Sequence, residues 1–406
     1  MHSIHDFTGK LRQPAVAPRL HAYIRWRREV ARARADGAPD PPADLQVPIS
    51  INLDLTTSCN FACTHCIDWD ILNTKHRYRE EELRESVELM AERGLKSVIL
   101  IGGGEPTLFP RFPDFVGFLK KLDLQVAIVT NGSRGEVLAE AAAHMDERDW
   151  IRLSLDSGSN ELFIAMHRPA KRGLDLDAIC EWIPRIRERG PKVRIGFSYI
   201  IVWDGASRSD EKIHENVHEI EMGAERAKRS GFDYIAFKPV LERQEEGAEI
   251  MDPAKSKVSL SEVIARIRTA VDNAKKLEDD TFQVYESINL RVLEDGSWQE
   301  FTRQPRTCHM QALRQVLTPI GLYNCPAHRG VEKAKIAEKD AYKNPETASR
   351  TGENLLQILD RFDASQECRE VTCLYNQANW WLEKMIGDPT LDLEAEIGDE
   401  GLDYFL

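Results

Sequence analysis

The segment Cys59-Asn60-Phe61-Ala62-Cys63-Thr64-His65-Cys66 is the starting point for interpreting this chain. Its three cysteines directly follow the apolar, β-rich run 49–55. Iron–sulfur clusters prefer thiolate ligands, and three thiolates at this spacing can hold one face of a [4Fe–4S] cluster. One of the four irons would then have no protein ligand and would be open to chemistry. The alternatives are a structural zinc site that lacks one ligand, or three buried thiols that happen to be close.

The spacing CxxxCxxC after a first strand resembles the radical S-adenosylmethionine (radical SAM) superfamily. The resemblance implies that the open iron binds the amino and carboxylate groups of SAM. It also implies that an electron from the cluster cleaves SAM to a 5′-deoxyadenosyl radical. The residue before the third cysteine is usually aromatic in this family, and here it is His65. This departure affects the contact that the family resemblance implies between this residue and the adenine of SAM. It leaves Cys59, Cys63 and Cys66 as the expected cluster ligands.

Length and composition limit the class of protein. At 406 residues the chain is long enough for two folded units. No apolar run has the length of a membrane span, and residues 1–16 lack the apolar stretch of a signal peptide. Eight cysteines without an export signal predict reduced, metal-binding thiols. Since the formal net charge is −13, we expect a cytoplasmic enzyme with no nucleic-acid or membrane partner.

From Ile49 onward, short β-rich runs alternate with helical patterns. The later runs are 97–101, 125–130, 151–155, 193–202 and 234–240. Strands that alternate with helices in this way predict a parallel sheet with right-handed crossovers. Six such units predict an α/β fold, an open, partial (β/α)6 TIM-like barrel, which the family resemblance also implies. In such barrels the chemistry collects at the carboxyl ends of the strands, where the three cysteines lie.

The same patterns divide the chain into five segments. Residues 20–35 predict an amphipathic helix, and residues 388–406 hold seven acidic residues without Lys or Arg, which predicts a solvated tail. The expected segments are an N-terminal helix and linker (1–48), the barrel (49–245), a charge-rich bridging segment (246–300), a cysteine-containing extension (301–385) and an acidic tail (386–406).

Polar residues at the predicted strand ends supply candidate SAM ligands. Consecutive glycines in 102–104 allow the backbone to approach a ligand closely, because no Cβ intervenes. The family resemblance implies that a GGEP-like motif holds the amino group of SAM, and that other strand ends reach its ribose and carboxylate. Ordinary turn chemistry and a solvated loop are the alternatives for these positions. The candidates are Gly103, Gly104, Glu105 and Pro106 in the motif, and Asn131, Ser154, Asp156 and Arg168 elsewhere.

Catalytic residues are not defined by a motif, and the candidates are Lys238, Tyr199 and Cys180. An inward lysine in a dry barrel needs a partner, so Lys238 would face either a substrate anion or a neighbouring carboxylate. Tyr199 is a polar residue on another predicted strand. Some radical SAM epimerases use a lone cysteine as hydrogen-atom donor, but Cys180 shares an apolar helical face in 176–186, which favours core packing.

A second cysteine group comprises Cys308, Cys325, Cys368 and Cys373. The first two flank a predicted β-hairpin that turns at 319–321. This order resembles the SPASM/twitch extension of radical SAM enzymes and implies one auxiliary [4Fe–4S] cluster. Structural zinc in the same thiols is the alternative.

These features predict an oxidoreductase that abstracts a hydrogen atom from a small polar substrate, sugar-like or aminocyclitol, with the auxiliary cluster as electron acceptor. A low-potential electron donor such as flavodoxin or ferredoxin is expected as partner. Epimerisation or dehydration of a similar substrate and modification of a ribosomally made peptide remain alternatives. One helix and a linker before residue 49 are too little for a leader-binding domain, which favours the small molecule.

Overall fold

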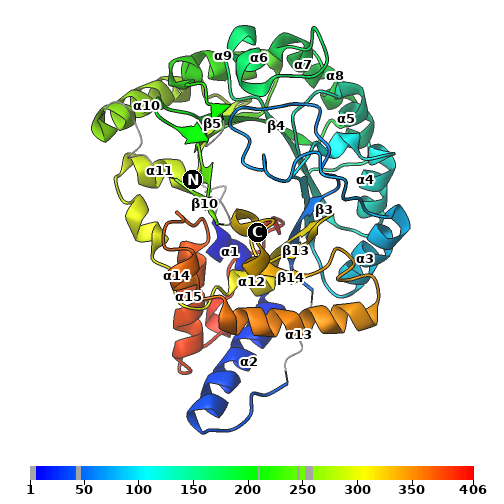
Figure 1. The fold of residues 1–406 in the computed structure, drawn as a ribbon, viewed down its shortest axis with the longest axis vertical. Coiled ribbons are helices and arrows are strands. Elements are labelled where there is room, and N and C mark those ends of the chain that lie inside the picture. Colours follow the sequence, from blue (N-terminus) through cyan, green and yellow to red (C-terminus); the bar gives the residue numbers. More distant parts are fainter. Residues whose placement is uncertain (1–5, 43–46, 209–210, 245–246, 252–258) are drawn as a thin grey trace.

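The computed structural model describes residues 6–42, 47–208, 211–244, 247–251 and 259–406. Its main feature is a ten-stranded sheet with the order β11-β8-β5-β4-β3-β2-β1-β12-β13-β14. Figure 1 shows this sheet curved around a central space, with helices on its outer side. The strands are β1 (Ser50–Asp54), β2 (Ser97–Ile101), β3 (Gln125–Thr130), β4 (Trp150–Ser154), β5 (Arg194–Ile201), β8 (Tyr234–Pro239), β11 (Gln283–Glu286), β12 (Arg314–Thr318), β13 (Gly321–Tyr323) and β14 (Lys335–Ala337).

The predicted α/β partial barrel is confirmed, with two more parallel strands than the six expected. Strands β1, β2, β3, β4, β5 and β8 lie side by side in chain order and run parallel. Strand β11 adds a parallel neighbour to β8, and β12 adds one to β1. The predicted hairpin is present as β12 and β13, which pair antiparallel. The bridging segment therefore contributes one strand, β11, to this sheet, and the cysteine-containing extension contributes three, β12, β13 and β14.

The outer helices form because one face of each is apolar. In α3, Leu83, Val87 and Met90 are buried on one face, three glutamates occupy the first turn, and the helix ends before Gly94 at φ 103°. The outer helices are α3 (Glu80–Glu92), α4 (Phe112–Lys121), α5 (Gly135–Ala142), α6 (Asn160–His167), α7 (Leu176–Cys180), α8 (Ile183–Arg189), α9 (Ile220–Ser230), α10 (Leu260–Lys275) and α11 (Ile288–Glu294).

A second group of helices packs beside β12 to β14. The predicted N-terminal helix is α2, and it lies against α15, where the Arg28 guanidinium donates to the Met385 and Asp388 carbonyls at 2.6 and 3.0 Å. The helices of this group are α1 (Phe7–Leu11), α2 (Ala17–Ala35), α12 (Met310–Leu313), α13 (Pro345–Arg361), α14 (Ala364–Glu367) and α15 (Asn376–Gly387).

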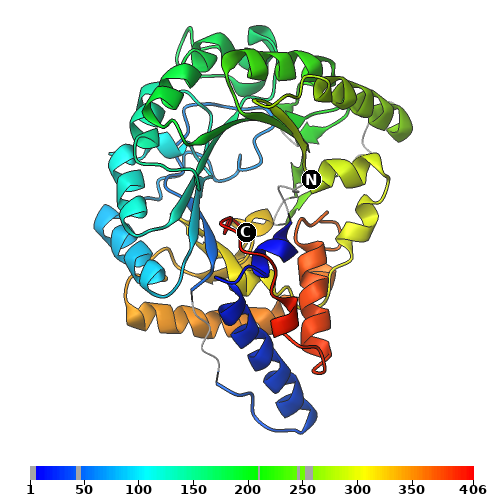
Figure 2. The same ribbon diagram turned by 180° about the vertical axis from the view of Figure 1, so that it is seen from behind.

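The end of the acidic tail is not solvated, contrary to the expectation from its charge. Phe405 and Leu406 are buried, and the Phe405 ring lies 5.5 Å from that of Trp150 at the start of β4. Ser97, at the start of β2, donates to the Tyr404 carbonyl at 2.7 Å. Figures 1 and 2 both show the C-terminal end inside the ring of strands. The prediction was wrong here because the last three residues are apolar or aromatic and bury at the amino ends of the strands.

Side chains on the strands alternate between the helical layer and the interior of the barrel, which we call the lumen. On β4, Ile151 and Leu153 are buried against the helices, whereas Arg152 and Ser154 line a cavity of about 530 Å³ in the lumen. The cavity runs from the cysteine loop at the carboxyl ends of the strands to the tail at their amino ends. Among the described residues, no helix is long and apolar enough to cross a membrane.

Candidate active site

The three N-terminal cysteines lie on the loop that follows β1, at the carboxyl ends of the parallel strands. All three are half-buried, and Cys63 and Cys66 line the lumen cavity. The loop is held by backbone hydrogen bonds from Glu105 N to the Ser58 carbonyl at 2.8 Å and from Thr64 N to the Met166 carbonyl at 2.8 Å. These contacts hold the cysteine loop between the segment that follows β2 and the end of helix α6.

The chemistry of this donor set fits a bound metal cluster. Burial raises the pKa of Cys66 to about 12. Burial, followed by repulsion from Cys66 and Cys59, raises the pKa of Cys63 well above its ordinary value. Thiols in such surroundings become thiolates when a metal supplies positive charge. Cys59, Cys63 and Cys66 are therefore suited to hold the [4Fe–4S] cluster that their spacing predicts.

The GGEP motif follows β2 and supports the cysteine loop. A Cβ on Gly104 would lie 2.5 Å from the Thr56 carbonyl oxygen, so only glycine allows the two loops to approach this closely. Gly103 N donates to the Asp54 carboxylate at 3.1 Å. Neither glycine lines the lumen cavity, and neither does Glu105 or Pro106. The contact of this motif with SAM stays a prediction.

The Glu105 carboxylate is engaged by the protein itself. It is 2% exposed and accepts four hydrogen bonds. The donors are Thr107 N and Oγ1, Thr130 Oγ1 at 2.7 Å and Asn131 N at 2.8 Å. Its side chain therefore joins the ends of β2 and β3, and a SAM contact from this motif would have to come from backbone atoms.

We expect Glu105→Gln to lower the free energy of unfolding by about 2–4 kcal/mol, because a buried amide cannot accept from all four donors. Urea unfolding under anaerobic conditions measures this change. The exposed Glu136→Gln is the matched control and should stay within about 0.5 kcal/mol of wild type. An equal unfolding midpoint for Glu105→Gln and the control would contradict the assigned role.

The other predicted SAM ligands divide into two groups. Asn131, Ser154 and Asp156 line the lumen cavity near the cysteine loop, and Asn131 Nδ2 donates to Asn60 Oδ1 at 3.0 Å. Arg168 does not line the cavity. Its guanidinium pairs with Glu211 at 2.8 and 2.9 Å, so the structure does not bring it together with the other three.

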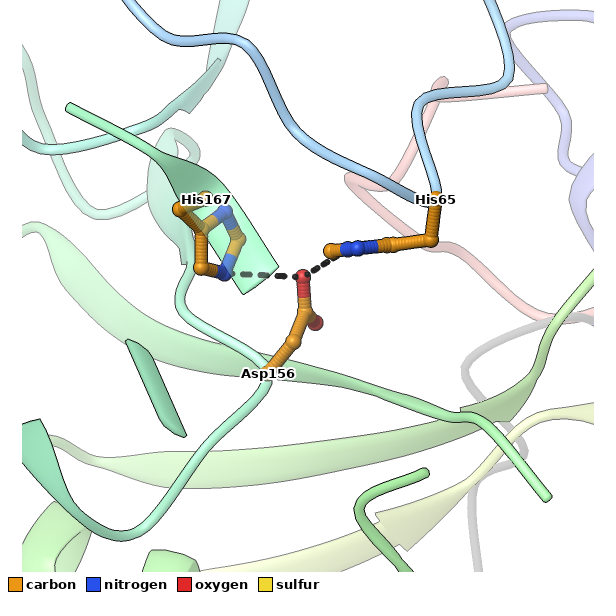
Figure 3. A group of neighbouring side chains, drawn as sticks. All are labelled: His65, Asp156 and His167. Carbon is orange, nitrogen blue, oxygen red and sulfur yellow. Dashed lines mark hydrogen bonds and ion pairs between the residues drawn. The ribbon is translucent and has the colours of Figure 1, made fainter. Parts of the chain in front are cut away.

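A buried cluster of His65, Asp156 and His167 joins the cysteine loop to the end of β4 (Figure 3). The Asp156 carboxylate lies 3.0 Å from His65 Nε2 and 3.5 Å from His167 Nε2. His167 Nδ1 lies 3.2 Å from the Cys63 sulfur. Burial would raise the pKa of Asp156, but the hydrogen bond from His65 and the nearby His167 lower it below its usual value.

The sequence offered only one indication of this cluster. His65 departs from the aromatic residue that the family usually has, and the structure gives it a polar partner, the Asp156 carboxylate. The sequence gives no sign of His167, because it comes a hundred residues after the cysteine loop and belongs to no motif. Its position at the end of α6 becomes meaningful only once that helix lies against the loop.

The three catalytic candidates have different positions. Lys238 lines the lumen, as expected for an inward residue of β8. Tyr199 points into the helical layer, where it is 0% exposed and its hydroxyl donates to the Asn216 carbonyl at 2.8 Å. Its prediction as a catalytic residue is wrong, because its side chain does not face the lumen. Cys180 is buried on α7 away from the cavity, which agrees with core packing. Arg152, which the sequence analysis overlooked, also lines the lumen.

The four C-terminal cysteines come together around a second cavity of about 190 Å³. Burial, followed by repulsion from Cys325 and Cys308, raises the pKa of Cys373 well above its ordinary value. Burial and the neighbouring Cys308 likewise raise the pKa of Cys325 to about 12. Cys368 also lies 3.5 Å from His328 Nε2. A metal centre suits this group of thiols, and its identity stays a prediction.

Arg329 links the two cysteine regions and was not predicted. It is buried four residues after Cys325, and its guanidinium lies 2.7 Å from the Asp68 carboxylate, two residues after Cys66. It also lies 2.9 Å from the carboxylate of Asp54 at the end of β1. A change at either end of this buried ion pair would leave an uncompensated charge.

Comparison with known proteins agrees with this geometry. A family model, the radical SAM superfamily, matches residues 53–236, which include all three N-terminal cysteines. Residues 53–236 form a radical SAM domain. A domain of this family implies SAM and a [4Fe–4S] cluster as cofactors.

Curated relatives match only part of this chain. An S-adenosylmethionine-dependent nucleotide dehydratase from a Thermoplasmatales archaeon (strain ISO4-H5) is 30% identical over 152 residues, 37% of this chain and 52% of the relative. The mycofactocin maturase MftC of Mycobacterium tuberculosis (strain CDC 1551 / Oshkosh) is 29% identical over 29% of this chain and 30% of the relative. The chain thus spans about half or less of these relatives.

Solved structures show the same fold over more of the chain. Native anSMEcpe with bound AdoMet has a TM-score of 0.54 at 14% identity and covers 84% of this chain and 96% of that one. Streptococcus suis SuiB bound to S-adenosylmethionine has a TM-score of 0.53 at 16% identity and covers 83% and 70%. At these identities the likeness concerns the fold alone.

Proposed function

We propose that this chain is a radical SAM oxidoreductase that oxidises a small polar substrate in the lumen, with an auxiliary cluster on the four C-terminal cysteines as electron acceptor. The observation that supports this proposal is that the lumen cavity and the C-terminal cysteine cavity share a wall. The residues that line both are Leu241, Glu249, Asn289, Arg314, Leu374 and Tyr375. A substrate in the lumen would therefore lie beside the C-terminal cysteines.

The substrate's C–H bond and a neighbouring O–H or N–H bond become C=O or C=N. One hydrogen atom leaves to the 5′-deoxyadenosyl radical that the bound cofactors supply, one proton leaves to a base, and one electron leaves to the auxiliary cluster. Glu249 is suited to take the proton: among the described acidic residues only it lines both cavities. Burial, followed by the charge of Asp68, raises the pKa of Glu249 to about 7, where a general base works well. A low-potential donor such as flavodoxin or ferredoxin would supply the first electron.

Two other reactions are supported by single observations. Five cationic side chains line the lumen, which suits the dehydration of an anionic substrate, as in the relative named a nucleotide dehydratase. Similarity to MftC, a maturase by name, supports the alternative of a maturase. Residues Asp403, Phe405 and Leu406 line the lumen at the amino ends of the strands and reduce the space for a peptide, which favours a small molecule.

Turnover in D2O separates oxidation from epimerisation. If the enzyme oxidises its substrate, we expect no solvent deuterium at the reacting carbon. We also expect Cys180→Ala to keep the turnover of folded, cluster-loaded enzyme and to lower the free energy of unfolding by about 1 kcal/mol. The measurement is mass spectrometry of the product, together with the yield of 5′-deoxyadenosine. Deuterium at the reacting carbon, or loss of turnover in Cys180→Ala with 5′-deoxyadenosine still formed, would indicate an epimerase. A product lighter by one water would indicate a dehydratase.

A further inference from the structure

Two cationic side chains, Arg152 and Lys238, face the lumen from strands that are separated by β5. In the sheet, Arg152 of β4 is in register with Gly196 of β5, and Lys238 of β8 is in register with Ile200. Both Arg152 and Lys238 line the lumen cavity. Burial, followed by the charge of Arg152, lowers the pKa of Lys238 well below its ordinary value, so a bound anion would favour its charged form.

Neither cation is neutralised by the protein. Arg152 Nε is buried without a hydrogen-bond partner, and the guanidinium stacks on the Trp150 ring at 4.9 Å. Among the residues that the structure describes, no hydrogen bond or ion pair reaches the Lys238 ammonium. Asp156, the acidic group that acts on Lys238, is already engaged by His65 and by Ile200 N. Two unpaired charges in a low-dielectric site are costly unless a ligand compensates them.

The lumen as a whole is positive although the chain is negative. Five Lys and Arg residues line the cavity against three Asp and Glu residues, whereas the whole chain carries −13. The other three cations have partners: Lys10 pairs with Asp403, Arg194 donates to the Tyr285 hydroxyl, and Arg314 donates to Asn52 Oδ1. Arg152 and Lys238 are thus the two lumen cations without a hydrogen-bonding or ion-pairing side chain among the described residues.

We propose that Arg152 and Lys238 form a subsite for an anionic group, a phosphate or a carboxylate, of the substrate. This inference rests on the proposed function in taking the lumen as the substrate chamber. Since Arg152 precedes Ser154 by two residues, it lies about 7 Å deeper in the barrel. By the same registers Lys238 lies two residues nearer the carboxyl ends than Ser154, so the two cations bracket the middle of the lumen.

SAM does not explain the pair equally well. SAM carries a sulfonium and an ammonium against one carboxylate, so it is a cation overall and would add to the positive charge of the lumen. The family resemblance also places its carboxylate on the open iron at the cysteine loop. A separate anion is the simpler counter-charge for Arg152 and Lys238.

Calorimetric titration of anaerobic, cluster-loaded protein tests the subsite without turnover. The probes are glycerol 3-phosphate, succinate and uncharged glycerol; the first two distinguish a phosphate from a carboxylate substrate. We expect one of the two anions, and not glycerol, to bind wild type with an affinity that falls as salt rises. Arg152→Gln and Lys238→Met should each weaken this binding at least about tenfold, and Lys238→Arg should restore most of it. The control Arg194→Gln, in the same lumen but engaged by Tyr285, should change it less than about threefold.

Thermal unfolding supplies a second measurement. Lys238→Met should raise the melting temperature of the ligand-free protein, since an amine that is buried without a partner is removed. A lowered melting temperature would give Lys238 a structural partner and overturn the proposal. Absence of anion binding to wild type would also overturn it, and so would an equal loss of anion affinity in Arg194→Gln. Weaker SAM binding in the two variants, with anion binding as in wild type, would assign the pair to SAM and also overturn it. If the protein bound the anion as expected but oxidised no substrate, only the proposed reaction would be refuted.

Discussion

The triple variant of Cys59, Cys63 and Cys66 to Ala should contain about four fewer irons than wild type and form no 5′-deoxyadenosine. Anaerobically reconstituted wild type should hold about eight irons, four for each of two clusters. The loop supplies three thiolates to one cluster, and the other five cysteines do not line the lumen cavity. Iron analysis and chromatography of the SAM cleavage products measure both effects.

Cys180→Ala is the matched control for this experiment, because it removes a buried thiol that lies away from both cavities. It should keep all the iron and all the SAM cleavage. If the triple variant still made 5′-deoxyadenosine, the assignment of the loop as the SAM-cleaving site would be wrong. If it lost all eight irons, the two cysteine groups would depend on each other, and the buried Arg329–Asp68 ion pair would be the first contact to investigate.

Changing both Cys308 and Cys325 to Ala should have the second largest effect. We expect the loss of about four irons and of substrate oxidation, with some SAM cleavage left, because SAM is cleaved at the other cysteine group. The shared wall of the two cavities gives the physical reason: without the second cluster, the substrate radical has no neighbouring electron acceptor. The measurements are iron content, 5′-deoxyadenosine and oxidised product in the same reaction.

The matched control is again Cys180→Ala, which should keep both products in their wild-type ratio. Zinc in place of iron in the purified protein would refute the auxiliary cluster and leave the four thiols as a structural site. Oxidised product at the wild-type rate from the double variant would refute the role of this centre as electron acceptor.

Much of the barrel and its metal-binding thiols could be predicted because the signals are local in sequence. The spacing of Cys59, Cys63 and Cys66 is contained within one loop, and each strand–helix unit has its own apolar pattern. Period-two alternation in 150–154 could also have identified Arg152 as an inward residue beside Ser154. A single charge within an apolar strand is a weaker signal than a polar residue at a strand end, where ligands bind in such barrels.

Only the tertiary structure decided which distant residues meet. Burial of Phe405 and Leu406 at the amino ends of the strands depends on the barrel leaving apolar space there, which charge counting along the tail cannot show. The pairing of Arg329 with Asp68 and the contact of His167 with Cys63 likewise join segments more than a hundred residues apart. Local patterns determine helices, strands and clustered ligands, whereas the partners of buried charges depend on how the strands are ordered and how the sheet curves. The sequence by itself therefore indicated the radical SAM domain and its cysteine loop, and the folded barrel decided which charges meet in its lumen.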